Sequence, residues 1–211
     1  TKVPGGPTST WVHEVLRPGD EVDVEGPYGT FVVDEQEASP LLLLGGGSGL
    51  APIRAIAEDL LRRRTGRDVT LFFSARTERD LIDEPDLLRW ARDECSFRYL
   101  RTLTGSTGPA PVGRIPTLLP QLVDIAPDSQ VFAAGPPGFV VDCAHAAKDL
   151  GASAARVHTE EFFSDPLIDA VGSIDEAVCT LGLARALTQG PALADDVLRA
   201  SSGLCSRPPP T

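Results

Sequence analysis

Short apolar runs and amphipathic segments alternate through residues 39–165 of the chain. The apolar runs predict five strands, over residues 41–44, 69–74, 97–102, 130–134 and 156–159. The segments between these strands predict helices near residues 50–64, 85–93, 115–122 and 136–150. Strands that alternate with helices at this spacing form βαβ units. We therefore expect an α/β fold built on a doubly wound, five-stranded parallel sheet.

The two ends of the chain have a different pattern. Residues 1–38 are rich in Gly and Pro and contain strand candidates over 21–25 and 30–33, joined by the turn Gly26-Pro27-Tyr28-Gly29. Two strands and a turn do not make an independent fold, so this part must complete something larger. Residues 166–211 predict helices near 174–187 and 191–201, followed by a Pro-rich end, and we interpret them as a helical or disordered extension.

Composition narrows the function. The chain has 19 basic and 30 acidic residues, a net charge of −11, which argues against a nucleic-acid partner. The densest basic run, Arg62-Arg63-Arg64 with Arg67, falls at a predicted helix C-terminus, where cations suit the helix dipole. We expect neither a membrane span nor a signal peptide, since no apolar run approaches ~18 residues. The chain starts with Thr1 and has no Met, so we expect its natural start to lie upstream.

The cysteines indicate the compartment and exclude one kind of site. Their spacing is too wide for a zinc or iron–sulfur ligand cluster and favours a reduced compartment over a disulfide scaffold. We therefore expect a cytoplasmic protein without a metal. The four positions are Cys95, Cys143, Cys179 and Cys205.

The glycine-rich turn after the first predicted strand is the most informative stretch. Gly45, Gly46, Gly47 and Gly49 separate an apolar run from a helical apolar period. A strand, a glycine turn and a helix in this order leave backbone N–H groups free and aim a helix N-terminus at an anion. A diphosphate is the expected ligand, and a tight connection without a ligand is the alternative. We expect valine at Gly47 or Gly49 to abolish dinucleotide binding, because its side chain would occupy the space of the diphosphate.

This turn differs from the G-x-G-x-x-G fingerprint, because Leu50 stands where the third glycine would be. No acidic residue ends the second predicted strand, where NAD-binding domains bind the ribose hydroxyls. That strand instead ends with Ser74 and Arg76, a hydroxyl and a guanidinium that suit a 2′-phosphate. A solvated loop arginine is the alternative. The pattern favours NADPH over NADH.

In chain order, these motifs resemble the ferredoxin–NADP reductase-like flavoprotein family, of the oxygenase or desaturase reductase type. Residues 46–52, Gly-Gly-Ser-Gly-Leu-Ala-Pro, are similar to its G-G-[ST]-G-x-x-P loop, residues 134–137 to its C-G-P-P loop, and residues 160–162 to its closing E-x-F. Residues 5–12 resemble the segment that touches the flavin diphosphate, and residues 19–20 and 26–31 resemble the last strands of the flavin barrel. The similarity covers residues 5–163.

The resemblance implies that hydride passes from NADPH or NADH to FAD or FMN, and that electrons then leave for a separate ferredoxin, oxygenase or desaturase. Residues 1–38 would be the C-terminal part of an FAD-binding β-barrel, and residues 39–165 the NAD(P)-binding domain. Ala134 and Glu160 would lie beside the reacting nicotinamide, and a solvated strand end is the alternative for Glu160. The implied cofactor-binding residues are Gly6, Ser9, Thr10, Gly46, Gly47, Ser48, Gly49, Pro52, Ser74, Arg76, Gly135, Pro136, Pro137 and Phe162. Core packing is the alternative for Phe162.

The chain departs from the family pattern in three places. The flavin-binding R-x-Y-[ST] motif would precede residue 1, so we expect these 211 residues to purify with little flavin. Ala134 stands in place of the cysteine near the nicotinamide, which would alter the rate of hydride transfer. No C-x4-C-x2-C cluster occurs, so we expect no plant-type [2Fe–2S] site. The alternative function is a nucleotide-binding fragment without redox activity.

Overall fold

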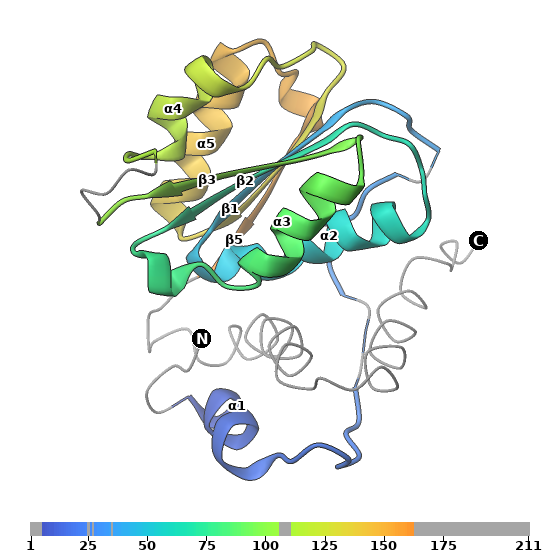
Figure 1. Cartoon of the computed structure of the whole chain (residues 1–211), viewed down its shortest axis with the longest axis vertical. Coiled ribbons are helices and arrows are strands. Elements are labelled where there is room, and N and C mark those ends of the chain that lie inside the picture. The colour runs from blue at the N-terminus through green and yellow to red at the C-terminus, as the bar shows by residue number, and fades with distance from the viewer. Residues whose placement is uncertain (1–5, 25, 27, 35, 106–110, 163–211) are drawn as a thin grey trace. The chain divides into compact units, whose positions relative to one another are not determined.

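The computed structural model describes residues 6–24, 26, 28–34, 36–105 and 111–162. The chain divides into two compact units, and one of them is Val33–Phe163. A five-stranded parallel sheet in the order β3-β2-β1-β4-β5 forms its centre (Figure 1). The predicted doubly wound sheet is confirmed, and each strand runs one or two residues further than predicted. The strands are β1 Leu41–Gly46, β2 Val69–Ala75, β3 Phe97–Leu103, β4 Gln130–Gly135 and β5 Val157–Glu161.

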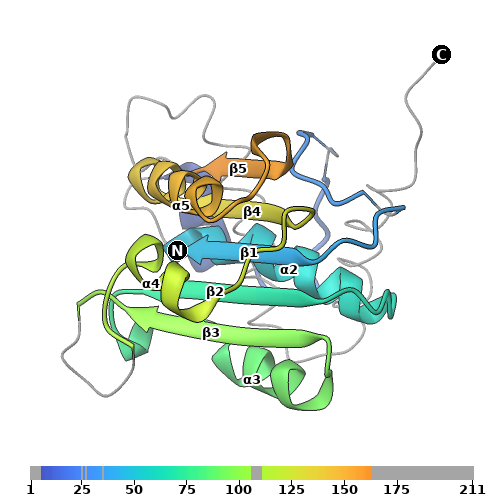
Figure 2. The same ribbon diagram turned by 90° about the horizontal axis from the view of Figure 1, so that it is seen from above.

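Four helices cover the two faces of this sheet. Helices α2 and α3 lie on one face, and α4 and α5 lie on the other (Figures 1 and 2). Their apolar residues recur with the helical period; in α2 the buried positions are 50, 53, 57 and 60. All four predicted helices are confirmed. Their bounds are α2 Leu50–Arg62, α3 Glu84–Asp93, α4 Ile115–Leu122 and α5 Pro137–Asp149.

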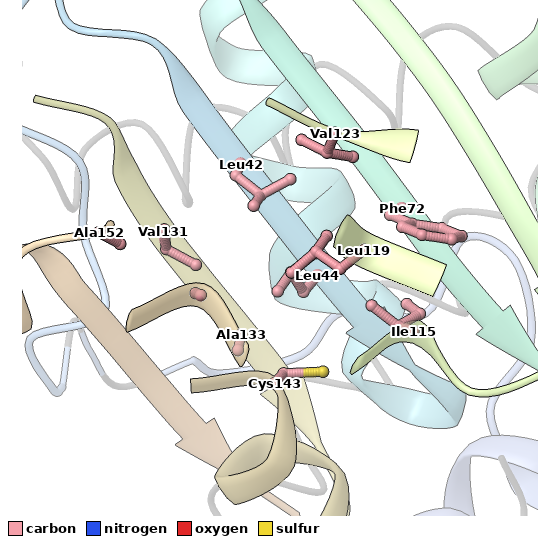
Figure 3. Close-up of a cluster of buried hydrophobic side chains, with 11 residues drawn as sticks. Leu42, Leu44, Phe72, Ile115, Leu119, Val123, Val131, Ala133, Cys143 and Ala152 are labelled. Carbon is pink, nitrogen blue, oxygen red and sulfur yellow. The ribbon is translucent and has the colours of Figure 1, made fainter. Parts of the chain in front are cut away.

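The core between the sheet and helices α4 and α5 is apolar (Figure 3). Leu42 and Leu44 of β1 pack there with Ile115 and Leu119 of α4. Burying a side chain of this size stabilises the fold by about 1.5–3 kcal/mol. Cys143 of α5 belongs to the same cluster, and burial raises the pKa of its thiol to about 12. Cys143 therefore packs as a small apolar side chain rather than as a reactive thiolate.

A buried arginine fixes the amino ends of the strands. Arg67 is only 5% exposed, and its guanidinium donates to the carbonyl oxygen of Ser39 at 2.9 Å and to Oε1 of Gln130 at 3.1 Å. Burial lowers the pKa of Arg67 below its usual value. The expected position of Arg67 at the C-terminus of a helix is wrong, because α2 ends at Arg62.

Glu37 joins the same network. The carboxylate of Glu37 accepts hydrogen bonds from both terminal nitrogens of Arg156, at 3.1 and 3.0 Å, and another from Gln130. Arg156 stands directly before β5, and Gln130 begins β4. These bonds attach Glu37 to the sheet. The predicted division into parts 1–38, 39–165 and 166–211 stays a prediction.

Residues 6–32 belong to the other unit. They form a helical turn, α1 Pro7–Thr10, followed by a π-helical turn over Trp11–Val15, and neither was predicted. The predicted strands over 21–25 and 30–33 are wrong, since the described residues in both ranges form none. A strand needs a hydrogen-bonded partner, whereas the described backbone bond here is local, from Val32 N to Thr30 O.

The helices predicted near 174–187 and 191–201 lie outside the described residues. Within the described ranges, none of the helices has the length and apolar character that crossing a membrane requires.

Candidate functional site

All five strands are parallel, so their carboxyl ends meet along one edge of the sheet (Figure 2). The register places Gly46 opposite Ser74, and Ala134 opposite Glu160. The strand order reverses between β1 and β4, and ligands of such sheets bind in the crevice outside that point. We call this region the carboxyl edge, and define it as residues 46–49, 74–76, 134–137 and 160–162.

At one position of the glycine loop between β1 and α2, the backbone has a conformation that only glycine adopts readily, and open space surrounds it. Gly47 has φ +56°, and a Cβ atom added to it would meet no atom within 4 Å. A side chain is thus disfavoured by backbone conformation rather than by contact. Ser48 follows in a short 3₁₀ turn, and Pro52 lies in the first turn of α2, where no intrahelical N–H is needed. This geometry fits an anion close to the backbone.

At Gly49, glycine is required for a different reason, which is the close approach of another part of the backbone. A Cβ atom there would collide with the carbonyl group of Ala134 and lie 2.6 Å from the backbone nitrogen of Gly135. The expectation that a side chain at Gly49 would fill the space of a diphosphate is therefore wrong. A side chain at Gly49 would first push the glycine loop away from the end of β4. The close approach joins two loops that are 85 residues apart in the sequence.

A ring that sequence reasoning did not single out lies against both loops. Cβ atoms added to Gly46 or to Gly135 would each lie 2.9 Å from the nearest atom of the Phe139 ring. Gly135 has φ +152° and leads into Pro136 and Pro137, where α5 begins. Only the apolar character of Phe139, in the first turn of the predicted helix, pointed toward a packing role.

The end of β2 carries an unpaired cation. Arg76 is exposed, and within the described part of the chain its side chain makes no ion pair or hydrogen bond. Its backbone is held, since the carbonyl oxygen of Arg76 accepts a hydrogen bond from Gly105 N at 2.8 Å. Ser74, two residues earlier, is half-buried beside Gly46.

The acidic residues after Arg76 are engaged elsewhere. Asp80 accepts hydrogen bonds from the backbone nitrogen and hydroxyl of Thr77, at 3.0 and 2.8 Å, in a capping box. Glu78 accepts from Arg101 at 2.9 Å. These contacts leave the Arg76 guanidinium available to an external anion.

The end of β5 closes the carboxyl edge beside β4. Glu160 is half-buried opposite Ala134, which is fully buried. The backbone nitrogen of Phe162 donates to the carbonyl oxygen of Gly135 at 2.9 Å, and the Phe162 residue is half-buried. The structure thus brings together the predicted residues from 46 to 162.

The predicted flavin contacts lie in the other unit. Gly6 precedes α1, the backbone nitrogen of Thr10 donates to the carbonyl oxygen of Gly6 at 3.0 Å, and Ser9 is buried. Pro7 at the start of this helical turn has no N–H to contribute. Gly6, Ser9 and Thr10 therefore lie together on one helical turn, and their contact with a flavin stays a prediction.

Comparisons with known proteins agree with this geometry. The family model described as "Oxidoreductase NAD-binding domain" matches residues 43–145. The chain is 33% identical, over 167 residues, to the terephthalate 1,2-dioxygenase reductase component 2 of Comamonas sp., covering 78% of this chain and 49% of that protein. The chain spans about half the length of the curated relatives it matches.

Solved structures share the fold. The crystal structure of the Amycolatopsis cytochrome P450 reductase GcoB aligns with a TM-score of 0.68 and 31% identity, covering 78% of this chain and 51% of that chain. A ferredoxin NADP⁺ reductase from Neisseria gonorrhoeae, solved with bound FAD and NADP, aligns with a TM-score of 0.60 and 22% identity, covering 77% and 72%. At that identity the second likeness shows the fold alone.

Proposed function

Because this chain belongs to the ferredoxin–NADP reductase-like family through its oxidoreductase NAD-binding domain, we propose that it takes electrons from NAD(P)H for a separate acceptor protein. The electrons would pass through FAD or FMN. The acceptor would be an iron–sulfur protein such as a ferredoxin, an oxygenase or a desaturase. The relatives named as dioxygenase and cytochrome P450 reductases support an acceptor of this class.

The observation that carries the proposal is the glycine loop at the carboxyl edge. Gly47 offers bare backbone with open space around it, directly after a buried strand and before the N-terminus of α2. The residues proposed to surround the coenzyme diphosphate are Gly46, Gly47, Ser48, Gly49 and Pro52 on one side of the crevice. Gly135, Pro136 and Pro137 are proposed for the other side. The groups present fit a diphosphate, because backbone N–H donors and a helix N-terminus favour an anion.

Coenzyme choice is proposed to depend on the end of β2. Arg76 is exposed and unpaired among the described residues, and Ser74 stands beside the glycine loop. A guanidinium and a hydroxyl suit the 2′-phosphate that distinguishes NADPH from NADH. The engagement of Glu78 and Asp80 with their own partners supports a preference for NADPH.

The reacting end of the coenzyme is proposed to lie at the ends of β4 and β5. A flavin, when bound, supplies the hydride-accepting and one-electron chemistry. The chain's own residues would position the nicotinamide and exclude water: buried Ala134 beneath it, and half-buried Glu160 where a carboxylate stabilises the positive charge of the oxidised ring. Phe162 would cover the flavin, held in place by its backbone bond to Gly135.

The flavin diphosphate is proposed to contact Gly6, Ser9 and Thr10. Residues 1–38 would then complete a flavin-binding barrel, residues 39–165 would bind NAD(P)H, and residues 166–211 would be an extension. The position of these three residues together at one helical turn, Pro7–Thr10, supports this assignment.

Absorbance measurements test the proposed function. The purified chain, supplied with FAD or FMN, is mixed anaerobically with NADPH and then with an artificial one-electron acceptor such as ferricyanide. We expect NADPH to bleach the flavin absorbance near 450 nm, a general property of reduced flavins, and the acceptor to restore it. NADPH that binds without any bleaching, although the chain has bound the added flavin, would contradict the redox function.

A second candidate is a domain that binds the coenzyme without redox activity. It is favoured by the observation that the described residues before Val33 form no strand, although a flavin barrel requires several. Binding of NADPH without bleaching would support this candidate.

A further inference from the structure

The ring of Phe139 touches both loops of the carboxyl edge. A Cβ atom added to Gly46 would lie 2.9 Å from both Cγ and Cδ1 of the ring, and one added to Gly135 would lie 2.9 Å from Cδ1. The Cβ at Gly135 would also lie 2.8 Å from the carbonyl oxygen of Gly46. The ring and the two glycines therefore form one close contact between the ends of β1 and β4.

The core holds this ring from behind. Phe139 lies in the first turn of α5, is half-buried, and packs against the apolar cluster that includes Leu44 of β1 and Ala133 of β4. A phenyl ring is rigid, so a shift of the ring would also shift the backbone that it contacts. The spacing of the two strand ends thus depends on where the ring sits.

We propose that Phe139 is a positioning residue for the nicotinamide half of the coenzyme, an inference that rests on the proposed function. A dinucleotide spans the crevice at the point where the strand order reverses, here between β1 and β4. With the adenosine half beside Arg76 at the end of β2, the nicotinamide half faces β4 and β5. The ring therefore affects the nicotinamide half, at the end of β4, more than the adenosine half, which is bound mainly at the end of β2.

Gly46 offers an independent probe of the ring. Its backbone, with φ −122° and ψ 118°, is ordinary extended chain that any residue adopts. The Phe139 ring supplies all three of the nearest atoms that a Cβ there would meet. Gly46→Ala should therefore displace the ring in the native chain, whereas Phe139→Ala makes room for the added methyl group.

The test measures binding to the full 211-residue chain by calorimetry. The ligands are whichever of NADPH and NADH binds more tightly, and the matching adenosine half, adenosine 2′,5′-bisphosphate or AMP. The variants are Phe139→Ala, Phe139→Leu, Gly46→Ala and the double variant Gly46→Ala/Phe139→Ala. Val141→Ala is the control, because Val141 is exposed on the same helix. Thermal unfolding of each variant shows that it is folded.

We expect Phe139→Ala to weaken dinucleotide binding at least about tenfold and binding of the adenosine half less than about twofold. Phe139→Leu, which keeps an apolar side chain against the core, should lose less. The double variant should bind no worse than Phe139→Ala alone, which is the non-additivity of a direct contact. If Phe139→Ala does not fold, the inference is tested on Phe139→Leu and Gly46→Ala instead. For these variants, too, the loss of dinucleotide affinity is compared with the loss of affinity for the adenosine half.

Equal losses for the dinucleotide and its adenosine half would show a merely structural role and overturn the inference. Wild-type affinity in the Phe139 variants, or additive losses in the double variant, would also overturn it. A wild-type chain that binds neither coenzyme would overturn the proposed function and this inference together. Normal wild-type binding with unaffected variants would overturn the inference alone.

Discussion

Gly49 approaches Ala134 so closely that no side chain fits between them: a Cβ atom on Gly49 would collide with the Ala134 carbonyl group and lie 2.6 Å from Gly135 N. The glycine loop after β1 and the end of β4 are thereby packed backbone to backbone. These two loops flank the point where the strand order reverses, which is where ligands of such sheets bind.

Because of this contact, we predict that a side chain at Gly49 destabilises the fold itself and does not act on coenzyme binding alone. Gly49→Ala should lower the free energy of unfolding by about 1–3 kcal/mol, the usual cost of overpacking. Gly138→Ala is the matched control, because Gly138 lies in α5 with nothing within 4 Å of an added Cβ. Alanine is a better helix former than glycine, so the control should be neutral or slightly stabilising. Urea unfolding compares the two, and equal stabilities would contradict the contact.

A second prediction concerns coenzyme choice. Arg76→Ala should weaken NADPH binding by about 1–3 kcal/mol, the range for hydrogen bonds to charged groups, and leave NADH binding unchanged. Arg98→Ala is the control, since Arg98 is exposed near the opposite end of β3. Calorimetric titration with both coenzymes provides the measurement. If both affinities fall equally, Arg76 does not bind the 2′-phosphate.

A third prediction concerns Arg67, the buried arginine at the amino ends of the strands. Arg67→Ala leaves the carbonyl oxygen of Ser39 and the amide oxygen of Gln130 without their donor, and should cost about 1–3 kcal/mol of unfolding free energy. Arg62→Ala, which removes a pair with Asp59 from a side chain that is 46% exposed, should cost at most about 1 kcal/mol. Chemical denaturation of both variants distinguishes them. Equal costs would contradict a buried structural role for Arg67.

A fourth prediction concerns pH. The ring of His158 stacks on Phe132 with centroids 4.5 Å apart, and burial lowers the pKa of His158, opposed by Glu37 and assisted by Arg156. A histidine whose folded pKa is depressed stabilises the fold above its unfolded pKa of about 6.5, and this contribution is lost as the pH falls through the folded value.

The unfolding temperature of the wild-type chain should therefore fall more steeply below about pH 6.5 than that of His158→Phe, which keeps a stacked ring. His145→Phe, at an exposed position, should behave as wild type. Differential scanning calorimetry over this pH range gives the slopes. The same slope in His158→Phe and wild type would show that His158 does not contribute.

The strands and helices of the sheet were predictable because each buries a regular set of apolar residues. Runs such as residues 41–44 fill strands buried on both faces. The apolar residues of α2 recur with the 3.6-residue period of a helix. Parallel strands place their carboxyl ends at one edge, so the grouping of the loops over 45–49, 74–76 and 135–138 was predictable from topology.

What failed depended on contacts between distant segments. The strands predicted over 21–25 and 30–33 needed partners that period-two alternation cannot specify. The burial of Arg67 depends on Gln130, 63 residues away, and the reason for glycine at Gly49 depends on Ala134. Phe139 was missed for the same reason: its sequence neighbours do not reveal that the ring lies on Gly46.

The central claim is that the carboxyl edge binds the coenzyme diphosphate at the glycine loop. It is tested most directly by titrating NADPH into the wild-type chain, Gly47→Ala and Gly66→Ala. Gly47 and Gly66 both have positive φ, +56° and +69°, and open space for a Cβ, so their backbone strain is matched. Gly47 directly follows β1 at the carboxyl edge, whereas Gly66 leads into the opposite end of β2.

We predict saturable 1:1 binding to the wild-type chain and to Gly66→Ala, and at least about tenfold weaker binding to Gly47→Ala, equivalent to about 1.4 kcal/mol. An added methyl group at Gly47 would meet no atom of the chain within 4 Å, so its effect on affinity reports on the coenzyme. Equal affinities of Gly47→Ala and Gly66→Ala, or no binding to the wild-type chain, would contradict the assignment of this edge as the coenzyme site.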